Sequence, residues 1–159
     1  MEELYDAGWR RFKLPIAADW DATVARLAAA RAVADDLWLG MDANWVFRSA
    51  EEVGRFSECI EHLDVGWIED VVPPGDATLV ARARSASRVP IAMGDEQGGA
   101  YHPDALLAEE SVDVIRIDVT TTGGITRLAA ILQRVRASGA AFSCHMFLHV
   151  TRKSSRRSA

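Results

Sequence analysis

Polar residues recur at regular intervals along the chain, each at the end of an apolar segment. These residues are four acids and one histidine: Asp42, Glu69, Asp95, Asp118 and His145. Successive members are 27, 26, 23 and 27 residues apart, about the length of one strand followed by one helix. Carboxylate oxygens suit a hard divalent cation, and a His linked to an Asp suits proton transfer. In a parallel α/β barrel the strand ends meet at one face, so this spacing gathers all of them into one site.

The rest of the chain alternates between strand and helix patterns, as such an architecture requires. Apolar strands are expected at 9–16, 37–42, 65–69, 89–94, 112–118 and 140–145. Helices are expected between them, the first over 20–36. The residues that start or stop the later helices are Ser49 with Glu52, Asp76, Pro103 and Gly139. Nearly continuous apolar strands joined by helices indicate a parallel sheet that is buried on both faces.

Two architectures fit this order, an open doubly wound sheet and a (β/α) barrel. Ligands of an open sheet gather at one switch point, whereas here each successive strand end carries a polar group, so we expect the barrel. Six strands are too few to close the usual eight-stranded barrel. We therefore expect a partial TIM-type barrel over residues 1–150, lacking the first and last strands, and a basic, disordered tail over 151–159.

Composition narrows the classes of partner. The formal net charge of −5 gives no reason to expect a nucleic-acid partner. The sequence shows no signal peptide and no apolar run long enough to span a membrane, so a cytoplasmic protein without a membrane partner is expected. Cys59 and Cys144 lie far apart and match neither a disulfide framework nor a zinc-binding spacing.

Six segments, in this order, resemble the barrel domain of the enolase superfamily, in the mandelate racemase and muconate lactonizing enzyme group that includes acid-sugar dehydratases. These segments are GWRRFKLPI, MDAN, WIEDVVPP, PIAMGDE, IDVTTTGGIT and FSCHMF. The resemblance implies a TIM barrel that uses Mg²⁺, acts on a small sugar acid and, in the full-length family enzyme, forms a homo-oligomer. It also implies a separate N-terminal capping domain, which this chain has no room to hold.

Carried over residue by residue, the resemblance assigns each member of the spaced series a role. It implies that Asp42, Glu69 and Asp95 are magnesium ligands, that His145 is the general acid/base, and that Asp118 orients it. Removing a proton next to a carboxylate creates a dianionic enediolate, and a divalent cation stabilises that charge.

The first strand departs from the family pattern at one position. Lys13 matches the first lysine of the motif and is expected to contact the substrate carboxylate, but Pro15 stands where the family has a second basic lysine. Without a second base, His145 alone serves both proton steps, which favours a lyase that eliminates water over a racemase, an epimerase or a lactonizing enzyme. Asn44 is either a substrate-binding residue or a simple turn residue.

Several residues keep two interpretations. Glu96 competes with Asp95 for the third metal position, and Arg116 either binds substrate or forms a structural ion pair with a neighbouring carboxylate. His149 is an unassigned loop residue, and His102 is expected at the surface.

A second function belongs to another class, a catalytically inactive barrel fragment with a structural or remnant role. Exposed edge strands and the missing capping domain favour it. On this view the 159-residue chain alone is expected to be inactive.

Overall fold

The computed structural model describes residues 1–95 and 101–145. In this part of the chain six parallel strands form one sheet, in the order β1-β2-β3-β4-β5-β6. The strands are β1 (Arg11–Pro15), β2 (Trp38–Asp42), β3 (Val65–Glu69), β4 (Ile91–Met93), β5 (Val114–Ile117) and β6 (Ala141–Cys144). The helices are α1 (Glu2–Asp6), α2 (Trp20–Arg31), α3 (Ala50–Ile60), α4 (Ala77–Ala86), α5 (Tyr101–Ala108) and α6 (Ile125–Ser138), with a short 3₁₀ helix η1 (Glu61–Leu63) after α3.

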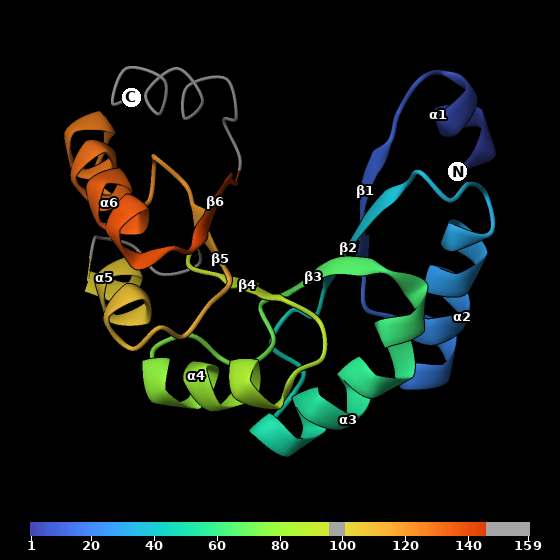
Figure 1. Cartoon of the computed structure of the whole chain (residues 1–159), viewed down its shortest axis with the longest axis horizontal. Helices are drawn as coiled ribbons and strands as arrows, with labels where there is room; N and C mark the ends of the chain where they lie inside the picture. The colour runs from blue at the N-terminus through green and yellow to red at the C-terminus, as the bar shows by residue number, and fades with distance from the viewer. Residues whose placement is uncertain (96–100, 146–159) are drawn as a thin grey trace.

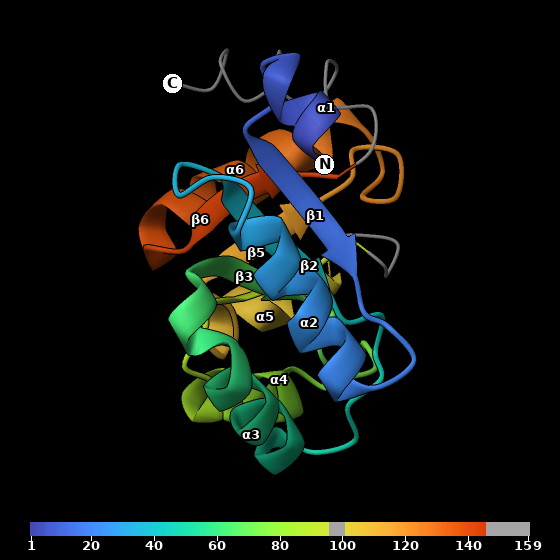
Figure 2. The same ribbon diagram turned by 90° about the vertical axis from the view of Figure 1, so that its right-hand side faces the viewer.

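The sheet curves into an open arc whose convex side is covered by helices α2 to α6 (Figure 1). Strands β1 and β6 form its two edges, and Figure 2 shows the β1 edge with α2 beside it. Strand order follows chain order without the reversal that defines an open doubly wound sheet. The prediction of a partial (β/α) barrel is therefore confirmed.

The strand register aligns side chains across the concave face. Lys13 pairs with Gly40, Pro15 with Asp42, and Asp42 with Glu69. Because successive side chains on a strand point to opposite faces, the residues between them point outward to the helices. The polar residues at the strand ends thus share the concave side.

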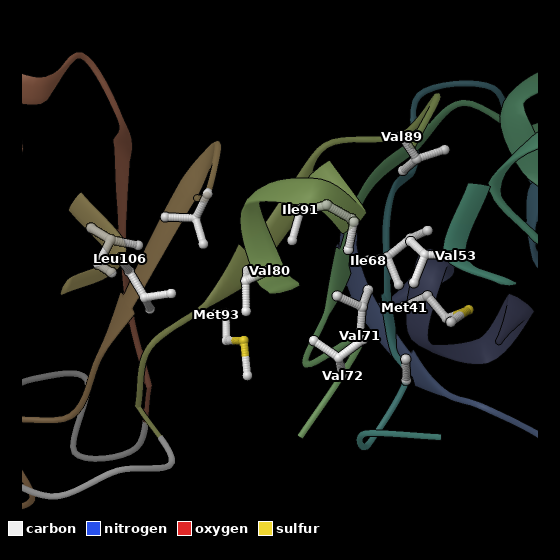
Figure 3. Close-up of a cluster of buried hydrophobic side chains, with 14 of the residues drawn as sticks. Met41, Val53, Ile68, Val71, Val72, Val80, Val89, Ile91, Met93 and Leu106 are labelled. Atoms are coloured by element: carbon white, nitrogen blue, oxygen red, sulfur yellow. The ribbon is translucent and has the colours of Figure 1, made fainter. Parts of the chain in front are cut away.

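The hydrophobic core lies between the sheet and the helices (Figure 3). Strand side chains such as Met41, Ile68 and Met93 pack against Val53 of α3 and Val80 of α4, and all of them are fully buried. Burial of each such side chain contributes about 1.5–3 kcal/mol. This layer fixes the positions of the strands, and hence of the residues that follow them.

Helix boundaries follow the predicted signals at three positions, with two exceptions. Pro103 does not begin its helix, because α5 already includes Tyr101. Ser49 accepts a hydrogen bond from the Glu52 amide at 3.3 Å, Asp76 caps α4, and Gly139 ends α6 with a φ of +78°. The helix predicted over 20–36 stops at Arg31 instead. The Arg31 guanidinium donates to backbone carbonyls of the following turn, which satisfies them without further helix.

None of the helices in the described ranges is both long and apolar enough to cross a membrane. The predictions for Glu96, for His149 and for the tail 151–159 fall outside the residues that the structure describes.

Candidate active site

The spaced residues all lie at the carboxyl edge of the sheet. Asp42 and Glu69 are the last residues of β2 and β3, and Asp95 follows β4 by two residues. Asp118 and His145 directly follow β5 and β6. The structure thus places the whole predicted series at one end of the sheet.

Three buried carboxylates gather at this edge. Glu69, Asp70 and Asp95 are 1%, 3% and 3% exposed, and one oxygen from each lies within 4.8 Å of the others. No hydrogen bond from the described residues reaches Glu69 Oε2 or either carboxylate oxygen of Asp95. A buried carboxylate oxygen without a hydrogen bond is costly, and a hard divalent cation relieves such a cost. The donor set therefore fits a metal such as Mg²⁺.

Lys13 connects two of the predicted metal ligands. Its Nζ lies 2.9 Å from Asp42 Oδ2 and 3.0 Å from Glu69 Oε1. Burial alone would lower the pKa of Lys13, but hydrogen bonds to the two carboxylates and their charges outweigh it and raise that pKa. Lys13 therefore stays protonated and balances charge at the site. Its contact with a substrate carboxylate, and the metal role of Asp42, stay predictions.

Two interpretations were open for Arg116, substrate binding or a structural ion pair, and the structure shows an ion pair with Glu69. Its Nε donates to Glu69 Oε1 at 3.0 Å, and its Nη1 donates to Ser143 Oγ at 2.7 Å and to the Cys144 carbonyl at 2.9 Å. The guanidinium also lies over the Trp67 ring, 5.5 Å from its centroid. The side chain is buried, and its Nε and Nη1 are both hydrogen-bonded to protein groups.

The imidazole of His145 lies between two carboxylates. Its Nδ1 is 2.9 Å from Asp95 Oδ2 and 3.6 Å from Asp118 Oδ2. The nearer contact lacks the alignment of a hydrogen bond and is a close polar contact between the ring nitrogen and the carboxylate. Asp118 Oδ1 accepts hydrogen bonds from the amide and the hydroxyl of Thr120. The role of Asp118 in orienting His145 stays a prediction, and the structure adds Asp95 as a second neighbour.

Asp70 is a member of the cluster that sequence reasoning missed. Alternation along a strand turns Asp70 to the opposite face from Glu69. The strand ends at Glu69, however, and Asp70 has a φ of +54°. This left-handed conformation, uncommon for a residue other than Gly, lets its side chain join the carboxylate group. The adjacent acids at a strand end were the available signal.

Asn44 and Trp45 lie in the turn after β2 and also have positive φ values, 48° and 59°. The backbone N–H of Asn44 donates to Asp42 Oδ1 at 3.1 Å, and Asn44 is exposed. Asn44 thus shapes the turn beside Asp42, and its contact with substrate stays a prediction.

The surface position predicted for His102 is wrong, because the residue is only 6% exposed. It lies four residues before Leu106 on α5, so helical spacing puts both on the buried face. Burial lowers the pKa of His102. The periodicity of α5 was the signal that identifies it as a buried residue.

The family described as "Enolase C-terminal domain-like" matches residues 1–155, and the chain belongs to that family. A D-galactonate dehydratase family member from Oceanicola granulosus is 33% identical over 51% of this chain and 20% of its own length. Arabinonate dehydratase from Saccharolobus solfataricus is 28% identical over 87% of this chain and 38% of its own length. The chain thus spans well under half the length of these curated relatives.

Solved structures show the same fold. L-talarate dehydratase from Polaromonas sp., crystallised with Mg and L-glucarate, superposes with a TM-score of 0.88 at 24% identity, over 96% of this chain and 44% of that one. A racemase from Streptomyces coelicolor with bound magnesium superposes with a TM-score of 0.87 at 24% identity. The match covers 97% of this chain and 45% of that one. The half-barrel is therefore an arrangement shared with larger barrel enzymes.

Proposed function

We propose that the strand-end site binds Mg²⁺ and removes the proton next to the carboxylate of a sugar acid, followed by elimination of water. The observation that carries this proposal is the group of buried carboxylates Glu69, Asp70 and Asp95, in which Glu69 Oε2 accepts no hydrogen bond from a described residue and Asp95 lies directly beside His145. A relative named as a D-galactonate dehydratase family member, another named arabinonate dehydratase, and structural neighbours solved with magnesium support it.

The proposed ligands are Asp42, Glu69 and Asp95, and Asp70 lies close enough to Glu69 and Asp95 to compete for the third place. When bound, Mg²⁺ would offset the negative charge that builds up on the substrate carboxylate as the α-carbon loses its proton. Parallel Mg²⁺ titrations of Asp42→Asn and Asp70→Asn identify the third ligand, and we expect the larger loss of affinity for Asp42→Asn.

The remaining steps belong to residues of this chain. Nδ1 of His145 faces Asp95 Oδ2 at 2.9 Å and Asp118 Oδ2 at 3.6 Å, and in this proposal the two carboxylates orient the ring so that Nε2 takes the α-proton. His145 then returns that proton to the departing β-hydroxyl, so water leaves and the enol product converts to a 2-keto-3-deoxy acid. Pro15 moves no proton, which is why a second base on the opposite face is not proposed.

A second candidate is a piece of barrel that binds the metal without turnover. Two observations favour it. The chain spans 20% of one dehydratase relative and 38% of another. Among the described residues, β1 and β6 each pair with one neighbour, so the concave face stays open. A racemase is the third candidate, since the N-succinyl-L-Arg/Lys racemase of Bacillus cereus is 22% identical over 83% of this chain.

One experiment separates the three. The chain is incubated in D₂O with Mg²⁺ and a panel of five- and six-carbon sugar acids, and proton NMR follows the α-hydrogen and any 2-keto acid. Exchange with keto-acid formation supports the dehydratase. Exchange with inversion and no keto acid supports the racemase. Mg²⁺ binding without exchange supports the inactive piece.

A further inference from the structure

One arginine joins two parts of the site that come from distant strands. Arg116 donates through Nε to Glu69, the last residue of β3, and through Nη1 to Ser143 and Cys144 of β6. Cys144 directly precedes His145. A single guanidinium thus connects a carboxylate of the proposed metal site with the strand that carries the proposed base.

The two oxygens of Glu69 have different surroundings. Oε1 lies 3.0 Å from Arg116 Nε and 3.0 Å from Lys13 Nζ. Oε2 is buried, and no described residue donates a hydrogen bond to it. A carboxylate held at one oxygen by two cations presents the other oxygen in a fixed direction.

Arg116 itself has little freedom to move. The residue is 6% exposed, and its guanidinium lies over Trp67 while three hydrogen bonds hold it. The planar fork of an arginine makes this geometry specific, because a lysine cannot reach both strands with one nitrogen.

We propose that Arg116 is a positioning residue, which aims Oε2 of Glu69 at the metal and fixes the end of β6 under His145. The metal part of this inference rests on the proposed function. A simple counter-charge would behave in the opposite way. Because a guanidinium repels a cation, removing a mere counter-charge would tighten Mg²⁺ binding, whereas removing a positioning residue weakens it.

The test compares wild-type chain with Arg116→Met and with a matched control, Arg84→Met. Arg84 has the same contact pattern, with Nε to Asp113 Oδ1 at 2.8 Å and Nη1 to the Glu110 carbonyl at 2.8 Å. Its carboxylate partner lies before β5, at the other end of that strand from the site. Calorimetry gives the Mg²⁺ dissociation constant, and circular dichroism checks the fold. Proton–nitrogen spectra of the metal-free chain report the His145 ring, whose signals are assigned with His145→Gln.

Arg116→Met is expected to bind Mg²⁺ about 10- to 100-fold more weakly and to shift the His145 ring signals. Arg84→Met is expected to change neither. Ser143→Ala serves as a milder variant if Arg116→Met does not fold, because it removes one contact of Nη1 and keeps the contact to Glu69. It should shift the His145 signals and leave Mg²⁺ affinity unchanged.

Equal or tighter Mg²⁺ binding in Arg116→Met would overturn the proposal, and so would unshifted His145 signals in both variants. Absence of Mg²⁺ binding in the wild-type chain would instead refute the proposed function. In that case the metal-free spectra still decide whether Arg116 fixes the strand below His145.

Discussion

Nδ1 of His145 lies 2.9 Å from Oδ2 of Asp95, a carboxylate at the end of another strand. The same Asp95 belongs to the buried carboxylate group at the strand ends. The proposed base and the proposed metal site therefore share a residue. Any change that alters the position of Asp95 is expected to affect both proton transfer and metal binding.

The first prediction concerns the single base. In any preparation that catalyses α-hydrogen exchange, His145→Asn should lower the exchange rate by about 10²- to 10⁴-fold, because an Asn side chain cannot accept the proton. Pro15→Ala should keep most of the rate, since Pro15 carries no proton. Deuterium incorporation followed by NMR measures both. Retained exchange in His145→Asn would identify another base, with Lys13 as the first residue to replace.

The second prediction concerns the ion pairs of Lys13. Without metal, Lys13→Met should destabilise the chain by about 1.5–3 kcal/mol, because Asp42 and Glu69 lose a shared cation. Added Mg²⁺ should stabilise this variant more than wild type, since the ammonium no longer competes for the same oxygens. Thermal unfolding with and without Mg²⁺ gives both values.

Arg10→Met is the control for Lys13→Met, because the Arg10–Asp36 pair is exposed. It should cost less than about 1 kcal/mol and leave the Mg²⁺ response unchanged. An equal Mg²⁺ response in Lys13→Met and wild type would show that Lys13 does not compete with the metal.

The third prediction is a pH dependence due to His102. Burial lowers its pKa below the ordinary value of 6.5, so the unfolded chain binds more protons than the folded chain. This contribution to stability is present in full above about pH 6.5 and is lost as the pH falls through the lowered pKa. Denaturant unfolding between about pH 5 and 7.5 should show a smaller loss in His102→Leu than in wild type. The exposed His62 provides the control, and His62→Leu should follow wild type.

The fourth prediction concerns packing on the concave face. A Cβ at Gly66 would lie 2.3 Å from Nε1 of Trp38 and 2.6 Å from its Cε2. Gly66→Ala should therefore destabilise the chain by about 1–3 kcal/mol in thermal unfolding. Combining it with Trp38→Leu should remove most of the additional cost. A fully additive double variant would mean that the two side chains do not meet.

The strand pattern, the helix caps and the strand-end series could be predicted from the sequence because each depends on local spacing. Apolar runs define strands, and Ser49 and Gly139 act on their own helices. The contact between His145 and Asp95 could not be predicted from the sequence, because it depends on how far each carboxylate lies beyond the end of its strand. Asp95 follows Gly94, whose φ is +136°, and lies two residues past β4.

The inclusion of Asp70 in the carboxylate group was equally inaccessible, since it depends on one left-handed backbone conformation. Tertiary pairing likewise determines that Lys13 and Arg116 meet at the same oxygen of Glu69. Residue types and spacing predict which groups gather, whereas the pairing among them depends on local backbone angles and on strand register.

Magnesium titration of wild type and Glu69→Gln tests the central claim most directly. Mg²⁺ at about 100 times its dissociation constant should stabilise the wild-type chain by about 2.7 kcal/mol. Glu69→Gln should lose this response, because an amide in place of the buried carboxylate removes one charged ligand. Asp113→Asn, remote from the site, should keep it. An unchanged Mg²⁺ response in Glu69→Gln would contradict the account and place the cation elsewhere.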